Sequence, residues 1–206
     1  MKEKKYCTNE YEHQYWQQEK LVLGIDEAGR GPLAGPLVVA GVVFPIGYEN
    51  KDIYDSKALS EKKREALFEV IQEDALSFTI SIVQEKEIDR LNIYRADQEA
   101  MKEIALKMMA DIVLTDAMPL EIEKPVFSLI KGDQKSISIA AGSILAKVTR
   151  DRLMKEYDKL YPEYGFAKNK GYGTKQHMEA IQTYGITPIH RRSFAPVAFH
   201  QETLDL

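Results

Sequence analysis

Four acidic residues of this 206-residue chain stand where carboxylates can do chemistry. Asp26 and Glu27 are adjacent and directly follow the apolar run Leu21–Ile25, while Asp116 and Asp133 each follow a later apolar run. We expect buried strands to end at these positions and to bring the carboxylates to one edge of a sheet. Carboxylates gathered in this way raise each other's pKa unless a cation lies between them. The pattern favours a site for Mg²⁺ or a similar cation, which prefers oxygen ligands and assists phosphoryl transfer.

A single Asp after a strand also suits an ordinary turn, which is the simpler interpretation of Asp116 or Asp133 taken alone. The pair Asp26-Glu27 differs, because neighbouring carboxylates in an apolar context bring no evident benefit to folding. The stretch Gly29–Pro36 that follows the pair predicts a loop. Its glycines let backbone N–H groups approach a ligand, and its arginine can pair with phosphate. It lacks the Gly-Lys-Ser/Thr of a phosphate loop, and its two prolines oppose a dinucleotide-binding helix, so a hairpin turn is the alternative.

The elements that must position these residues alternate between strands and helices. Besides the strand before Asp26, apolar patterning predicts strands at 37–44, 78–83, 111–115 and 126–130 and helices at 9–20, 60–76, 98–110, 138–160 and 174–184. The first two strands should form a hairpin, with Ser60 as an N-cap and Gly185 as a C-terminal cap later in the chain. No repeat or linker divides the sequence. We expect one α/β domain over residues 1–206, with a helical C-terminal part at about 136–192 and a tail at 193–206.

Composition narrows the class of protein. The chain has 44% hydrophobic and 29% charged residues, no apolar run near the ~20 residues of a membrane span, and no apolar secretory signal after Met1. A single cysteine, Cys7, excludes an intramolecular disulfide and a Cys-rich zinc site. We therefore expect a cytoplasmic protein without a membrane partner, and a monomer by default.

Charge is distributed unevenly along the chain. The whole sequence carries 28 Lys and Arg against 32 Asp and Glu, yet the segment Lys124–Arg192 carries 13 against 6. Such a segment can form a basic face for a polyanion, although solvated helix faces explain the same counts. Charge thus permits a nucleic-acid partner without requiring one.

Longer blocks carry a family resemblance. The segment Gly24–Pro36 resembles the signature of bacterial ribonuclease HII. The resemblance continues, in the family's order and over about residues 20 to 192, through Asp55-Ser56-Lys57, Asp116, Lys131-Gly132-Asp133, Ser138–Asp151 and Gly171–Thr174. Gly142 departs from the pattern, because the family more often has Ala there. We expect this difference to involve no functional group.

The resemblance implies a ribonuclease H-like fold, with a mixed central sheet flanked by helices and a helical C-terminal portion. It implies a metal-dependent endoribonuclease that cleaves the RNA strand of RNA/DNA hybrids. The enzyme would also nick 5′ of single ribonucleotides in duplex DNA, as in ribonucleotide excision repair. The family's acidic positions fall on Asp26, Glu27, Asp116 and Asp133, which would hold two Mg²⁺ or Mn²⁺ ions. One ion would activate a water and the other would stabilise the leaving oxygen, giving a 5′-phosphate and a 3′-hydroxyl.

The resemblance also implies a set of substrate-binding residues. The backbone of the family's Gly-Arg-Gly element would read the 2′-hydroxyl, and Tyr172 would stack on the next sugar. The Gly-Arg-Gly element falls on Gly29, Arg30 and Gly31. Lys57, Ser143 and Lys147 complete the set. Tyr172 could instead be a packing residue of a Gly-Tyr-Gly turn, but the flanking Lys168, Lys170 and Lys175 favour a nucleic-acid contact. Nearby His177, His190, Arg191 and Arg192 either extend this basic face or merely lie on the surface.

The last six residues resemble the peptide by which bacterial proteins dock on the replication sliding clamp, with Gln201, Leu204 and Leu206 as contacts. An ordinary frayed end is the alternative. Ribonuclease HIII is a rival family, but it has an additional N-terminal domain, whereas about 20 residues precede Leu21 here. A non-catalytic duplex-binding module is the other rival. Four carboxylates speak against such a module, because they would repel phosphates without benefit to binding.

Overall fold

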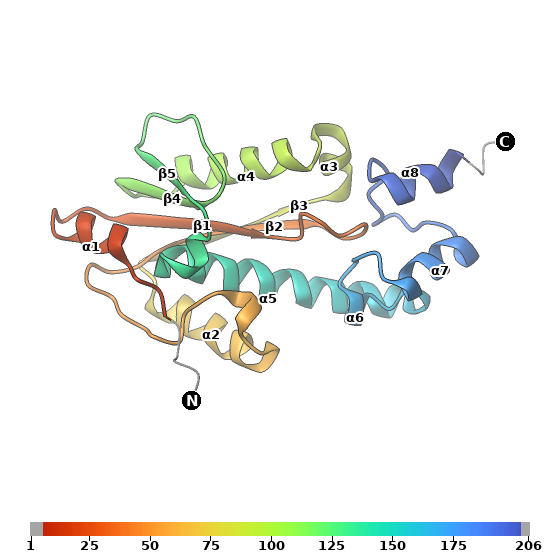
Figure 1. Cartoon of the computed structure of the whole chain (residues 1–206), viewed down its shortest axis with the longest axis horizontal. Coiled ribbons are helices and arrows are strands. Elements are labelled where there is room, and N and C mark those ends of the chain that lie inside the picture. The colour runs from red at the N-terminus through yellow and green to blue at the C-terminus, as the bar shows by residue number, and fades with distance from the viewer. Residues whose placement is uncertain (1–5, 203–206) are drawn as a thin grey trace.

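The computed structural model describes residues 6–202, in which a five-stranded mixed sheet lies between helices (Figure 1). The strand order is β3-β2-β1-β4-β5, and β1 is antiparallel to β2 but parallel to β4. The strands are β1 (Val22–Ala28), β2 (Leu37–Val43), β3 (Ser77–Val83), β4 (Ile112–Asp116) and β5 (Val126–Leu129). The predicted mixed sheet and the hairpin of the first two strands are confirmed.

Eight α-helices accompany the sheet in the described part of the chain. They are α1 (Glu10–Trp16), α2 (Glu61–Asp74), α3 (Glu85–Leu91), α4 (Ile93–Lys107), α5 (Ile137–Leu160), α6 (Phe166–Asn169), α7 (Lys175–Tyr184) and α8 (Ala195–Glu202). Ser60 caps α2 as predicted, since its hydroxyl accepts a hydrogen bond from the Lys63 N–H. Three helices were not predicted: α3, the single-turn α6, and α8, which occupies the stretch expected to be a tail. None of these helices is both long and apolar enough to cross a membrane.

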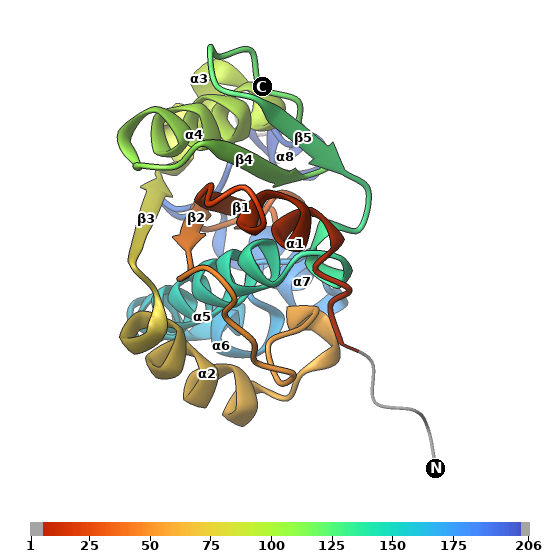
Figure 2. The ribbon, with the colours of Figure 1, turned by 90° about the vertical axis from the view of Figure 1, so that its left-hand side faces the viewer.

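Helices cover both faces of the sheet. Figure 2 shows α4 on one face of the sheet, with α5 and then α2 on the other, and Figure 1 places α6 and α7 near the C-terminal end of α5. The side chains of β1 alternate between the two faces. Leu23 and Ile25 pack in the cluster under α4, whereas Val22 packs in the cluster under α5. This alternation decides where the functional side chains of β1 point.

Two glycines allow α5 to lie unusually close to β1 and β2. A Cβ on Gly24 would overlap the backbone of Ser138 and Ile139 in α5. A Cβ on Gly142 would come within 2.7 Å of the Ala40 carbonyl oxygen and 3.2 Å of the Asp26 backbone nitrogen. The three nearest neighbours of a Cβ at 142 are backbone atoms, so alanine there would meet no functional side chain but would press on the strand that carries Asp26.

Candidate active site

Asp26 and Glu27 lie inside β1 and not beyond its end, so that part of the sequence-based prediction is wrong. The reason is the mixed sheet. Antiparallel pairing with β2 continues to Ala28↔Val38, whereas parallel pairing with β4 stops at Ile25↔Thr115. Asp26 and Asp116 are thus the residues next in line where β1 and β4 part, which brings two carboxylates of neighbouring strands together.

A third carboxylate joins them from the turn after β5. Lys131 adopts a left-handed conformation with φ 58°, and a 3₁₀ turn over Gly132–Gln134 then places Asp133 at the sheet edge. The Gly132 N–H donates to Asp116 Oδ1 over 2.8 Å, which fixes the turn against β4. One carboxylate oxygen from each of Asp26, Asp116 and Asp133 lies within 4.8 Å of the others. The structure therefore brings three of the four predicted acids into a group that could hold a cation.

Electrostatics within this group indicate unrelieved negative charge. Burial, followed by the charges of Glu27 and Asp116, raises the pKa of Asp26 well above its usual range. Burial, and then the charges of Asp55 and Asp116, raises the pKa of Asp133 to about 6. Hard oxygen donors that repel one another in a buried setting fit a divalent cation.

Glu27 lies on the other face of β1, beside a carboxylate that the sequence did not single out. Asp97 of α4 is fully buried, and the Arg30 guanidinium lies between the two acids, with Nε 3.4 Å from Asp97 Oδ2 and Nη1 3.8 Å from Glu27 Oε1. Burial and the charge of Asp97 raise the pKa of Glu27 to about 8. The signal for Asp97 was its spacing, because Met101 and Ile104 follow it on the same buried stripe of α4.

The glycine loop follows β1 and meets a distant part of the chain. Gly29 has φ +102°, and a Cβ there would overlap the Arg150 side chain. Exposed Gly31 lies beside the ring of Tyr172, since a Cβ on Gly31 would be 3.5 Å from Tyr172 Cε1. Tyr172 is 49% exposed, so its ring is available to a ligand. The loop and Tyr172, predicted separately, form one surface.

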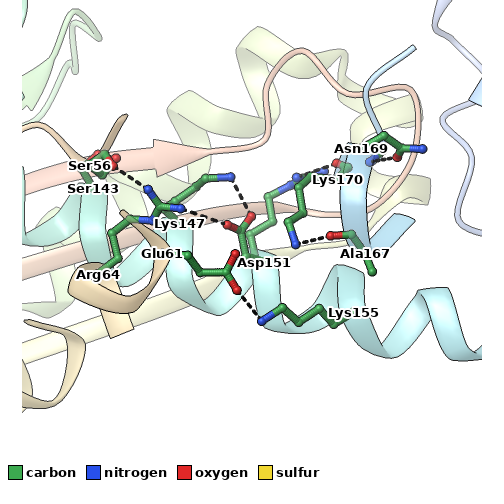
Figure 3. A network of polar contacts seen from close by, with 12 residues as sticks. Ser56, Glu61, Arg64, Ser143, Lys147, Asp151, Lys155, Ala167, Asn169 and Lys170 are labelled. Atoms are coloured by element: carbon green, nitrogen blue, oxygen red, sulfur yellow. Dashed lines mark hydrogen bonds and ion pairs between the residues drawn. The ribbon is translucent and has the colours of Figure 1, made fainter. Parts of the chain in front are cut away.

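A cavity of about 350 Å³ joins this surface to the polar residues of α5. Its lining comprises Glu27, Ala28, Gly29, Arg30, Gly31, Ser56, Lys57, Ser143, Lys147, Arg150 and Tyr172. Figure 3 shows the α5 side of this region, where the Ser56 and Ser143 hydroxyls are 2.9 Å apart and Lys147 Nζ pairs with Asp151 at 2.6 Å. All the predicted substrate-binding residues therefore line one cavity.

Of the four basic residues after Tyr172 that the sequence singled out, three differ from both sequence-based alternatives. Arg192 is exposed, but His177, His190 and Arg191 are buried and belong to neither a basic face nor the surface. The histidines form a directed chain of hydrogen bonds. The Thr187 N–H donates to His190 Nδ1, so His190 Nε2–H donates to His177 Nε2, and His177 Nδ1–H donates to the Tyr172 carbonyl. Both rings are neutral in this arrangement, and together they hold the backbone of Tyr172 in place.

Comparison with known proteins agrees with this geometry. The chain is 53% identical over 194 residues to the ribonuclease HII of Lactobacillus johnsonii, covering 93% of this chain and 78% of that protein. Its fold matches the ribonuclease H2 of Pyrococcus horikoshii with a TM-score of 0.74 at 26% identity, over 90% of this chain and 99% of that one. A ribonuclease HII of Archaeoglobus fulgidus, solved in complex with PCNA, matches with a TM-score of 0.74 at 28% identity, over 87% of this chain and 96% of that one. The family model of ribonuclease HII matches residues 23–197. The chain belongs to the ribonuclease HII family.

Proposed function

We propose that this ribonuclease cleaves the RNA strand of RNA/DNA hybrids and nicks 5′ of single ribonucleotides in duplex DNA, leaving a 5′-phosphate and a 3′-hydroxyl. One observation carries the proposal. Three convergent carboxylates lie beside a cavity that is lined by a glycine loop, an exposed tyrosine and two lysines. A module that only binds duplexes would have no use for acids that repel phosphate, whereas a phosphodiesterase needs them near the scissile bond.

Divalent cations, Mg²⁺ or Mn²⁺, fit this donor set. Asp26, Asp116 and Asp133 would hold them, with Glu27 as a further carboxylate on the adjoining face of β1. When bound, such ions supply positive charge to the scissile phosphate and favour ionisation of the attacking water. The chain's own contribution is to hold the acids in register through the β1–β4 pairing and the Gly132 hydrogen bond.

The remaining residues bind and orient the duplex in this proposal. The N–H groups of Gly29–Gly31 face the ribose, and Tyr172 packs on the neighbouring sugar. Lys57 and Lys147 neutralise phosphates, and Ser143 donates to one. Burial lowers the pKa of Lys57, but the charges of Asp26 and Asp133 outweigh that effect and raise it overall, so Lys57 stays cationic at neutral pH.

A nicking assay tests the function. Wild-type protein with Mg²⁺ or Mn²⁺ should cut a DNA duplex on the 5′ side of its single ribonucleotide and should spare the all-DNA duplex. Chelator or Asp26→Asn should abolish cutting, whereas Glu103→Gln, which alters an exposed acid of α4, should not. Binding without cutting by the wild-type protein would instead support the duplex-binding module.

We further propose that the C-terminal hexapeptide binds a sliding clamp. Leu204 and Leu206 lie outside the described residues, and Gln201 lies within α8. Support comes from the sequence resemblance and from the archaeal relative that was solved with PCNA. Deletion of residues 201–206 should abolish binding to a bacterial clamp without reducing nicking of a short duplex. Equal binding by the intact and the truncated protein would exclude the motif.

A further inference from the structure

Arg191 is a fully buried cation whose guanidinium faces backbone carbonyls. Its Nε donates to the Gly35 oxygen at 2.9 Å, Nη1 to the Arg30 oxygen at 3.0 Å and Nη2 to the Gly29 oxygen at 2.6 Å. Burying a charged group is unfavourable unless it is paired, and burial lowers the pKa of Arg191 to about 9. Three hydrogen bonds to carbonyls offset part of this cost and tie Arg191 to the glycine loop.

The carbonyls that Arg191 binds determine where the loop N–H groups point. In a planar trans peptide the C=O and the following N–H point in opposite directions. With the Gly29 and Arg30 carbonyls turned inward to Arg191, the N–H groups of Arg30 and Gly31 are turned away from it. Neither N–H donates to a backbone or side-chain acceptor of the described residues. Two unsatisfied donors are thus left at a loop that lines the cavity beside Tyr172.

We propose that Arg191 is the positioning residue for ribose recognition, holding two carbonyls inward so that the Arg30 and Gly31 N–H groups face the 2′-hydroxyl. This inference rests on the proposed function and names the residue on which its specificity depends. A guanidinium suits the role because its planar donors reach three carbonyls at once, whereas a lysine ammonium lacks that geometry. Arg191 touches no substrate; it acts through the loop.

The test separates ribose recognition from stability. Arg191→Lys keeps the charge and should lower kcat/KM for the single-ribonucleotide duplex about 10- to 100-fold, since two recognising donors lose their orientation. The inhibition constant of an all-DNA competitor duplex should change less than about twofold, because phosphate contacts remain. Lys124→Met is the matched control. Lys124 also donates to two carbonyls, those of Ala105 and Met108, but far from the loop in sequence, so this variant should lose stability and keep discrimination.

Equal loss of ribonucleotide cleavage and of all-DNA binding in Arg191→Lys would show a merely structural role and overturn the inference. Hydrogen exchange on the wild-type protein provides a second test that needs no variant. The Arg30 and Gly31 amides should exchange rapidly in the free protein and become protected by the ribonucleotide duplex but not by the all-DNA duplex. Protection in the free protein would mean that the peptides are turned the other way, which contradicts the inference. If the wild-type protein does not cleave at ribonucleotides although both amides exchange rapidly, the proposed function is refuted, and the role of Arg191 in ribose recognition falls with it; failure of the inference alone is the case in which the wild-type protein discriminates and Arg191→Lys discriminates equally well.

Discussion

At the scale of single residues, the buried carboxylate of Asp26 is placed for catalysis, but its ionised form destabilises the folded chain. Burial, with the charges of Glu27 and Asp116, raises its pKa, so the folded chain binds a proton at Asp26 more tightly than the unfolded chain does. Ionising this carboxylate therefore lowers the free energy of unfolding as pH rises from the unfolded value of 3.8 through the raised folded pKa.

Asp26→Asn should remove this penalty along with the activity. In chelator we expect a melting temperature about 2–4 °C above that of the wild-type protein at pH 8, and a smaller difference at pH 5. Thermal unfolding at the two pH values measures it. A difference that grows toward acid would have the wrong sign and would rule out ionised Asp26 as the destabilising group.

Asp97 affects the ionisation of its neighbour. Because burial and the Asp97 charge hold the pKa of Glu27 at about 8, Asp97→Asn should lower that pKa and leave Arg30 to pair with Glu27 alone. The acid limb of the pH profile of kcat/KM should then move to lower pH. Glu99→Gln, an exposed change in the same helix, is the control and should leave the profile in place. An unchanged limb in Asp97→Asn would show that Glu27 ionisation does not limit the rate.

At the scale of elements, the contact of α5 with β1 sets the position of the site. Two opposing effects decide the outcome of Gly142→Ala. Helix propensity favours alanine by about 1 kcal/mol, whereas overlap with the Ala40 carbonyl oxygen costs about 1–3 kcal/mol. We expect the overlap to prevail, with a lower melting temperature and a several-fold lower kcat, because α5 must move away from Asp26. A more stable and fully active variant would show that the helix shifts without consequence.

Local sequence patterns specify some elements of this fold and leave others undetermined. The five strands and the glycine loop were predictable, because local apolar runs and Gly-Pro punctuation specify them. The exact extent of β1 was not, since its last residues are held in the strand by β2 alone. Buried Arg191 and Asp97 were harder still, because charged residues are expected at the surface and their partners lie far away in sequence. The four acids stood out by their placement after apolar runs, and the family resemblance then assigned them a common role that spacing alone left open.

At the scale of the whole molecule, the basic segment from Lys124 to Arg192 contributes Lys147 and Arg150 to the lining of the cavity. Binding to a duplex should weaken with salt as phosphate contacts are screened. Lys147→Ala, at the cavity, should lower the slope of log affinity against log salt by about one. Lys159→Ala, which removes an exposed lysine paired with Glu156, should not. Equal slopes for wild type and Lys147→Ala would show that Lys147 does not contact a phosphate of the duplex.

A cytoplasmic location and a monomeric state remain predictions.

Because side chains alternate between the two faces of β1, the site depends on the register of this strand. Asp26 and Glu27 are neighbours in β1, yet Asp26 gathers with Asp116 and Asp133, whereas Glu27 also reaches towards Asp97 of α4. Inserting or deleting a single residue between Gly24 and Asp26 would exchange the two environments and also turn Leu23 or Ile25 out of its cluster. The acidic pair can therefore change by substitution, but a single insertion or deletion in this part of β1 would disrupt the core of the fold.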